Sequence, residues 1–119
     1  MSAEFSPKMF EYIVESLPMP VLFCDTGHVI RYLNKAAKYH YYEARPHPDL
    51  IGRNIQLCHK PETWDIVLKL YEQMKNEDLS EARVGTSRPE GYRIYMTAVR
   101  DENGELVGYL QRFEDGKHV

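Results

Sequence analysis

The chain has 119 residues, a length that fits one domain and leaves little room for two. Its net charge of -3 comes from acidic and basic side chains that are mixed along the chain, which argues against a nucleic-acid surface with a clustered basic face. No apolar run approaches the roughly 20 residues of a membrane span, and the first ten residues lack the apolar core of a secretory signal, so neither membrane insertion nor secretion is indicated.

The N-terminal segment predicts a short amphipathic helix. Ser6 can cap a helix over residues 6–16, and Pro7 suits its first position. Pro18 ends it, because a proline disfavours helical backbone at the residue before it. The apolar stripe of this helix consists of Met9, Phe10, Ile13, Val14 and Leu17. Such a stripe predicts either a dimer contact or a cover for the back of a sheet.

A hairpin and a second helix are predicted next. Val21–Asp25 is a short apolar strand, Thr26 and Gly27 supply a tight turn, and residues 29–33 form the return strand. Asn34 then predicts an N-cap for a short helix over residues 35–39.

The middle of the chain predicts irregular structure followed by the longest helix. Two prolines predict irregular backbone over residues 40–48, with room for one helical turn. Residues 49–54 are predicted as a turn and residues 55–57 as an extended piece. Pro61 suits the first position of a helix that continues to Lys75. Its inward stripe at helical spacing consists of Trp64, Val67, Leu68, Tyr71 and Met74.

Three further strands are predicted over residues 79–86, 91–100 and 106–113, the last two joined by a turn that ends in Asn103-Gly104. Strands joined by hairpins, with helices gathered between them, predict an α+β domain. We expect a five-stranded antiparallel sheet with short helices and one long helix on one face, flanked by the N-terminal helix.

Four segments together carry a resemblance to a known family. They are the hairpin over residues 21–30, the Tyr32-Leu33-Asn34-Lys35-Ala36-Ala37 step into a helix, the Ile51-Gly52-Arg53-Asn54 segment and the final hairpin over residues 100–108. In this order and spacing they resemble the PAS domain, from about Leu17 to Asp115. The Gly52-Arg53 to Cys58-His59 run is similar to one PAS branch that is often attached to hemerythrin-like modules. The resemblance implies an N-terminal helical cap over residues 1–16, a PAS-like sensor domain over 17–115 and a disordered tail over 116–119.

The resemblance further implies a sensory or interaction module. PAS domains of this type hold a small ligand between the inner face of the sheet and the helices, and often dimerise through the N-terminal helix. We therefore expect a cytoplasmic, non-enzymatic homodimer that binds an unknown small molecule or a signalling protein, and neither nucleic acid nor membrane. The residues expected to bind the ligand or cofactor are Ile30, Tyr32, Tyr39, Cys58, His59, Trp64, Val67, Leu68, Tyr71, Tyr92, Ile94 and Met96.

Two other functions stay open from the sequence. In a haem-based redox or gas sensor, His59 would be the metal ligand, with His40 as the substitute, because no histidine follows Pro61 on the long helix. A lone histidine is nevertheless more often structural than ligating. A small thiol enzyme would use Cys58, although residues adjacent in sequence rarely face each other productively. Flavin photochemistry is disfavoured, because Ile55 stands where light-sensing flavin PAS domains carry their reactive cysteine. Non-covalent flavin binding stays open as a less favoured alternative.

The remaining histidines and cysteines do not predict a zinc site. His28, His40, His47, Cys58 and His59 lack the paired short spacings of structural zinc sites. His47 lies between two prolines and is expected in an exposed loop. Cys24 and Cys58, without an export signal, predict free thiols in a reducing cytoplasm.

Overall fold

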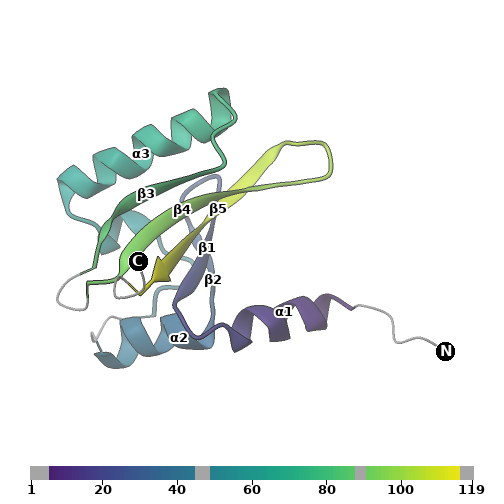
Figure 1. Cartoon of the computed structure of the whole chain (residues 1–119), viewed down its shortest axis with the longest axis vertical. Helices are drawn as coiled ribbons and strands as arrows, with labels where there is room; N and C mark the ends of the chain where they lie inside the picture. The colour runs from purple at the N-terminus through teal and green to yellow at the C-terminus, as the bar shows by residue number, and fades with distance from the viewer. Residues whose placement is uncertain (1–5, 45–48, 88–90, 116–119) are drawn as a thin grey trace.

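The computed structural model describes residues 6–44, 49–87 and 91–115. Five strands form one antiparallel sheet in the order β2-β1-β5-β4-β3. The strands are β1 (Val21–Asp25), β2 (Ile30–Leu33), β3 (Glu81–Thr86), β4 (Arg93–Arg100) and β5 (Leu106–Glu114). The helices are α1 (Pro7–Ser16), α2 (Lys35–Lys38), the π-helix η1 (Tyr39–Ala44), the 3-10 helix η2 (Ile55–Cys58) and α3 (Pro61–Asn76). The predicted α+β fold is confirmed (Figure 1).

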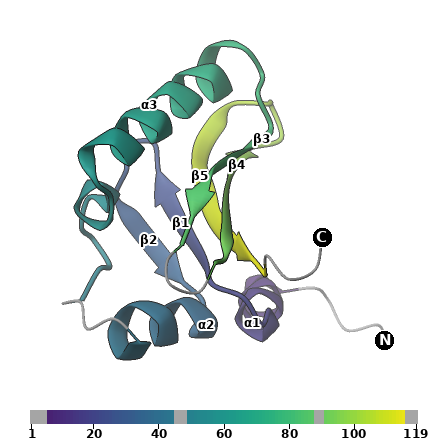
Figure 2. The same cartoon turned by 60° about the vertical axis from the view of Figure 1, so that its left-hand side comes forward.

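The core lies between the inner face of the sheet and α3. Leu22, Cys24, Met96 and Tyr109 are fully buried on the strands, because their side chains alternate toward α3. The helix buries four residues at spacings of three and four, which are Trp64, Val67, Tyr71 and Met74. Figure 2 shows α3 crossing the sheet while α1 and α2 lie together at one end of the molecule.

Leu68 does not join this stripe, and its predicted inward position is wrong. Its side chain is 36% exposed, whereas the neighbouring Val67 is fully buried. One residue further along an α-helix is a rotation of about 100°. The buried stripe therefore consists of residues 64, 67, 71 and 74, and Leu68 lies beside the face of α3 that packs on the sheet.

Tyr32 also lies elsewhere than predicted. The register of the first hairpin shifts between Phe23 and Cys24, so that Cys24 pairs with Ile30 but Phe23 pairs with Tyr32. Paired residues share a face of the sheet, and one extra residue in a strand moves the following side chain to the other face. Ile30 consequently points into the core, while Tyr32 lies on the outer face and donates a hydrogen bond to Glu15 of α1 (2.9 Å).

Asn34 holds three elements together from a buried position. Its side-chain oxygen accepts from the backbone N–H of Ala37 at the start of α2 (2.9 Å) and of Val21 on β1 (3.0 Å). Its amide nitrogen donates to the carbonyl groups of Val14 and Met19, each at 3.1 Å. The predicted N-cap is confirmed, and the same side chain anchors the end of α1.

The segment between α2 and α3 is more regular than predicted. Residues 39–44 continue α2 as a π-helix, whereas the prediction for residues 40–48 was irregular backbone with room for one helical turn. Residues 55–58 form the 3-10 helix η2 instead of an extended piece, because the Asn54 side chain accepts from the N–H of Gln56 (2.8 Å) and caps a turn. The predictions for His47 and for the tail over residues 116–119 lie outside the described residues.

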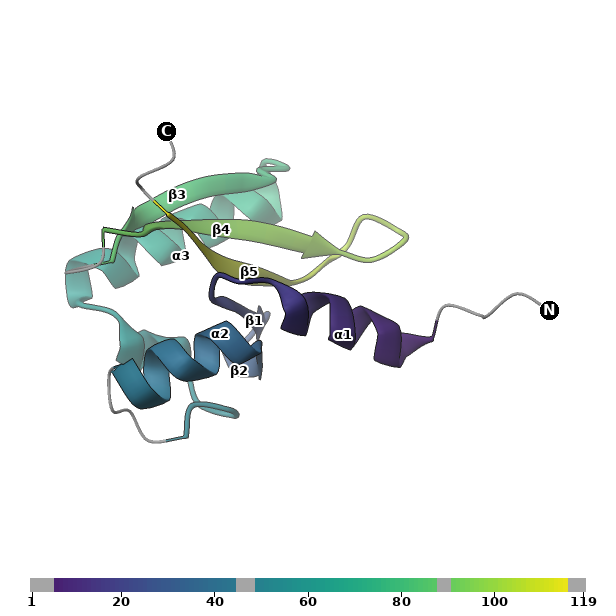
Figure 3. The same ribbon diagram turned by 60° about the horizontal axis from the view of Figure 1, so that its bottom comes forward.

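Helix α1 extends away from the sheet (Figures 1 and 3). None of its residues is buried, and Phe10, Tyr12 and Ile13 are 60%, 62% and 50% exposed. The apolar stripe therefore does not cover the back of the sheet, and several of its side chains are largely exposed in the single chain. Within the described residues, no helix is both long and apolar enough to cross a bilayer.

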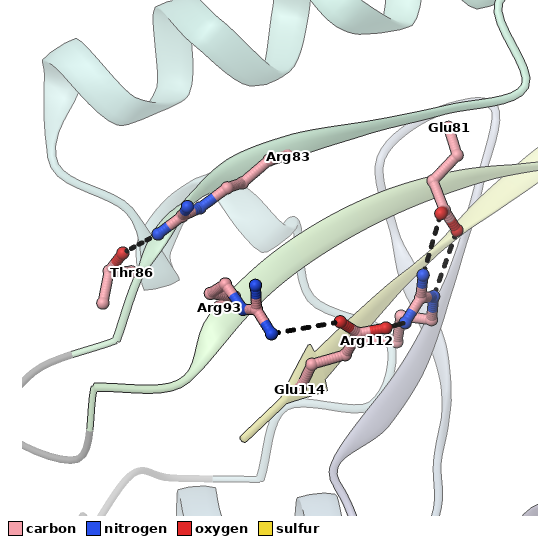
Figure 4. Close-up of polar contacts among 6 residues, drawn as sticks. All are labelled: Glu81, Arg83, Thr86, Arg93, Arg112 and Glu114. Atoms are coloured by element: carbon pink, nitrogen blue, oxygen red, sulfur yellow. Dashed lines mark hydrogen bonds and ion pairs between the residues drawn. The ribbon is translucent and has the colours of Figure 1, made fainter. Parts of the chain in front are cut away.

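The outer face of β3, β4 and β5 carries a network of paired charges (Figure 4). Arg112 makes a two-pronged contact with Glu81 (3.1 and 2.8 Å) and a further bond to Glu114 (2.7 Å). Its guanidinium also lies 4.8 Å from the ring centre of Tyr95, and Arg93 lies 4.0 Å from Glu114. The network ties the first residue of β3 to the end of β5 across the intervening strand.

Candidate functional site

A cleft of about 320 Å³ opens at the first turn of α3, between the helical segments and the inner face of the sheet. This volume is at the lower end of the roughly 300–1,000 Å³ of small-molecule sites. The cleft is lined by His40, Tyr41, Cys58, His59, Lys60, Thr63, Thr86, Ser87, Ile94, Gln111 and Phe113. The cleft borders only the first turn of α3, whereas the predicted ligand site extended along the whole inner face of this helix.

His59 joins the helical layer to the sheet across this cleft. Its Nδ1 lies 3.0 Å from the carbonyl oxygen of Ile55, which only a protonated Nδ1 can bond. Nε2 therefore holds the lone pair and accepts from the side-chain amide of Gln111 on β5 (3.3 Å). Burial lowers the pKa of His59, against the raising effect of these two partners, so the ring is neutral near pH 7.

Cys58 lines the same cleft as a protonated thiol. Burial raises its pKa to about 11. Because the thiolate is the nucleophile, a group with this pKa is poorly suited to attack at neutral pH. Burial of the thiol thus disfavours the thiol-enzyme alternative, and both Cys58 and Cys24 are free, as predicted.

The twelve residues predicted to bind a ligand separate into several environments. Cys58, His59 and Ile94 line the cleft. Tyr39 and Tyr92 line a second, more open groove of about 640 Å³ beneath the end of α1, and His40 is shared by the groove and the cleft. Tyr71 borders a third cavity of about 510 Å³ near the β4–β5 turn. Ile30, Trp64, Val67 and Met96 belong to the packed core, while Tyr32 and Leu68 lie away from the cleft as described above.

Several lining residues were not predicted. Gln111 is only 2% exposed and lies between Tyr109 and Phe113, which share the inward face of β5. A polar residue among the inward-facing apolar residues of a strand indicates a possible binding position, so the sequence contained a signal for Gln111. Tyr41 carried no such signal, because the π-helix that turns it inward is not visible in the sequence.

His28 has a structural position beside the site. It lies at the β1–β2 turn with a positive φ of 64° and packs its ring against Trp64 and Tyr71, with ring centres 5.2 and 4.7 Å away. Its Nδ1 shares a hydrogen bond of 2.8 Å with the hydroxyl group of Tyr109. Burial lowers the pKa of His28. The ring therefore packs between the β1–β2 hairpin and α3.

The cleft fits haem poorly. A histidine that donates Nδ1–H to a backbone carbonyl and presents Nε2 has the orientation of many metal ligands, and His59 has it. However, Nε2 is already engaged by Gln111, and about 320 Å³ favours a compact molecule over a porphyrin. In the described part of the chain, no three His, Cys, Asp or Glu side chains gather where they could hold a metal ion.

Comparison with known families agrees with this architecture. A family model described as PAS domain matches residues 10–116. The chain belongs to the PAS family. PAS domains are commonly sensory modules and generally not enzymes.

Solved structures with the same fold include several PAS domains. The C-terminal domain of a Streptococcus mutans protein is 26% identical, with a TM-score of 0.72 over 95% of this chain and 90% of that one. The PAS domain of a Colwellia psychrerythraea protein is 20% identical, with a TM-score of 0.62 and coverages of 91% and 94%. The Aer2 receptor from Vibrio cholerae, described as a dual PAS-heme oxygen sensor, is 20% identical, with a TM-score of 0.59 and coverages of 82% and 94%. No curated protein matches the chain.

Proposed function

We propose that this PAS domain is a sensor that binds a small molecule in the cleft at the start of α3. The observation that carries the proposal is the His59–Gln111 hydrogen bond, which spans the cleft and joins the helical layer to the sheet. A ligand that enters the cleft competes for these two polar groups. Occupancy therefore changes the link between η2, α3 and β5.

The signal has a physical route from the cleft to α1. His40 on η1 lines both the cleft and the groove beneath the end of α1. Glu15 of α1 accepts hydrogen bonds from the Tyr32 hydroxyl (2.9 Å) and from the N–H of Lys35 at the start of α2 (2.6 Å). A shift of η1 thus alters the contacts that hold the end of α1 on the domain. A full change of population needs a difference in ligand affinity equivalent to about 5 kcal/mol between the two states.

Native mass spectrometry of freshly expressed protein tests the ligand proposal. We expect a co-purified small molecule in the wild type, and its loss in Thr63→Trp, where a large ring fills the cleft from α3. Asp65→Trp places the same ring on an exposed position of the same helix and is the matched control. Equal retention of the molecule by both variants would show that it does not bind in the cleft. Absence of any bound molecule in the wild type would count against the proposal.

The output of the sensor is proposed to be a homodimer formed through α1. Phe10 and Ile13 are 60% and 50% exposed on a helix that projects from the domain. Phe10→Ser combined with Ile13→Ser should convert a dimeric mass to a monomeric one in light scattering, whereas Lys8→Gln on the same helix should not. An unchanged mass in the double variant ends the α1 role. The cytoplasmic location and a signalling protein partner remain predictions.

Haem binding through His59 is the second candidate, favoured by the Nδ1–H bond to the Ile55 carbonyl and by the haem sensor among the similar structures. Titration of the purified protein with hemin, followed by its absorption spectrum, decides it. A Soret band that disappears in His59→Ala supports haem, and a band that persists in this variant, or no band, rejects it.

A further inference from the structure

The lining of the cleft carries a positive charge and no carboxylate. Lys60 is the only Lys or Arg among the lining residues, and no Asp or Glu borders the cleft within the described part of the chain. The lining is otherwise made of hydroxyl, amide, imidazole, thiol and apolar groups. The cleft therefore favours an anionic molecule over a neutral or cationic one.

The first turn of α3 adds to this positive potential. The helix has 16 residues, and Lys60 at its N-cap provides no side-chain cap. The N–H of Trp64 bonds to the Lys60 carbonyl at 2.8 Å, while no described residue accepts a hydrogen bond from the N–H of Glu62 or Thr63. The Glu62 side chain is exposed and does not line the cleft. Free N–H groups and the helix dipole together attract a carboxylate.

Gln111 provides an independent polar contact inside the cleft. The residue is 2% exposed, and its amide nitrogen donates to Nε2 of His59. Among the described residues, none donates a hydrogen bond to its Oε1 atom, although the side chain lines the cleft. An acceptor that lines the cleft and has no donor from the described residues favours a ligand that brings one, such as a hydroxyl or amino group.

An apolar wall completes the cleft. Tyr41, Ile94 and Phe113 line it, and the ring of Phe113 is held by the ring of Tyr41 (6.4 Å between centres) and by that of His40 (4.9 Å). Such a wall accepts an aliphatic or aromatic group.

We propose that the cleft recognises a compact organic carboxylate that also carries one hydrogen-bond donor and one apolar group. The carboxylate lies by Lys60 and the first turn of α3, the donor meets Oε1 of Gln111, and the apolar group packs on Phe113 and Ile94. This inference rests on the proposed function, because it names the class of molecule that the same cleft takes.

Three matched probes test this recognition. Phenyllactate has all three groups, its methyl ester lacks the charge, and 3-phenylpropanoate lacks the hydroxyl group. Isothermal titration calorimetry of the full chain should give an affinity for phenyllactate about tenfold above that for the ester and several-fold above that for 3-phenylpropanoate. Trp64 is the only tryptophan and lies 6.1 Å from the His59 ring, so its fluorescence reports binding at this cleft.

Two variants separate the contributions. Lys60→Gln should weaken phenyllactate binding about five- to tenfold and leave the ester unchanged, whereas Lys69→Gln, at an exposed position of α3 outside the cleft, should change neither. Gln111→Leu should abolish the preference for phenyllactate over 3-phenylpropanoate. Circular dichroism confirms that each variant is folded.

The outcomes distinguish this inference from the proposed function. Equal affinity for the acid and the ester, or unchanged binding in Lys60→Gln, overturns the carboxylate inference. Failure of all three probes to bind also overturns it, while the proposed function is judged separately by the co-purified molecule. If the ester binds as well as the acid and Thr63→Trp blocks it, the sensor proposal stands and the ligand class is wrong.

Discussion

His59 illustrates how one side chain can be fixed by its surroundings. The Ile55 carbonyl sets its tautomer, Gln111 takes its lone pair, and burial keeps the ring neutral. Neither the two hydrogen bonds nor the burial follows from the residue type. The same ring in an exposed loop would titrate near pH 6.5. Its neighbours therefore decide both its charge and its availability to a ligand.

The lowered pKa values of His28 and His59 predict a stability that falls in mild acid. The unfolded chain binds a proton on each ring below about pH 6.5, before the folded chain does. The free energy of unfolding should therefore decrease from pH 7.5 to 5.5, by at most about 1.4 kcal/mol per pH unit for each ring. Urea titrations measure it, and His59→Gln should flatten the decrease. A stability that is constant over this window would contradict the neutral buried rings.

Cys58 should react slowly despite its place in an open cleft. With a pKa of about 11, very little thiolate is present at pH 8. Alkylation by iodoacetamide should be at least about tenfold slower than for a small-molecule thiol of ordinary pKa. Mass spectrometry of Cys24→Ala, which leaves one thiol, follows the reaction. A rate equal to that of the free thiol would restore the reactive-cysteine alternative.

At the scale of the elements, local signals predicted what local chemistry determines. Proline at the first turn located α1 and α3, and Asn34 located the start of α2. The failures are non-local or irregular. The shift between Phe23 and Cys24 moved Tyr32 to the other face, and the π-helix over Tyr39–Ala44 turned His40 and Tyr41 inward. The position of the candidate site was thus predictable near His59, but most of its lining depended on how distant segments pack.

Gly108 lies close to the backbone of β1 on the neighbouring strand β5. A Cβ there would lie 2.2 Å from the Cys24 carbonyl oxygen and 2.5 Å from the Phe23 ring, and the backbone of β1 cannot yield without moving its pairing. Gly108→Ala should therefore reduce the free energy of unfolding by at least about 1–3 kcal/mol. Gly85→Ala, which meets nothing within 4 Å, is the matched control. Equal denaturant midpoints for the two variants would contradict this packing.

At the scale of the whole molecule, α1 projects from the domain and is also hydrogen-bonded to it through its last turn. Its outward stripe is open, but its last turn holds Tyr32, Asn34 and Lys35 through Glu15 and Val14. A helix joined in this way can transmit a change in the domain without being part of the core. This arrangement suits a module whose output is a contact with a second copy.

Removal of residues 1–16 should therefore cost stability as well as any dimer contact. Asn34 is buried and would lose the Val14 acceptor, and the Tyr32 hydroxyl would lose Glu15. We expect a loss of about 1–3 kcal/mol in urea unfolding at a concentration where both forms are monomeric. Deletion of residues 1–5 only is the control. A truncated chain as stable as the control would mean that α1 is not fastened to the domain.

The number of residues in the π-helix over Tyr39–Ala44 directly influences which side chains line the cleft. A turn of this kind holds about one residue more than an α-helical turn, and removing one residue rotates everything after it by about 100°. A deletion of a single codon there would change which of the aromatic rings of η1 face the cleft, without any substitution in the strands. Natural variation in ligand preference could thus arise from gaps as readily as from point changes.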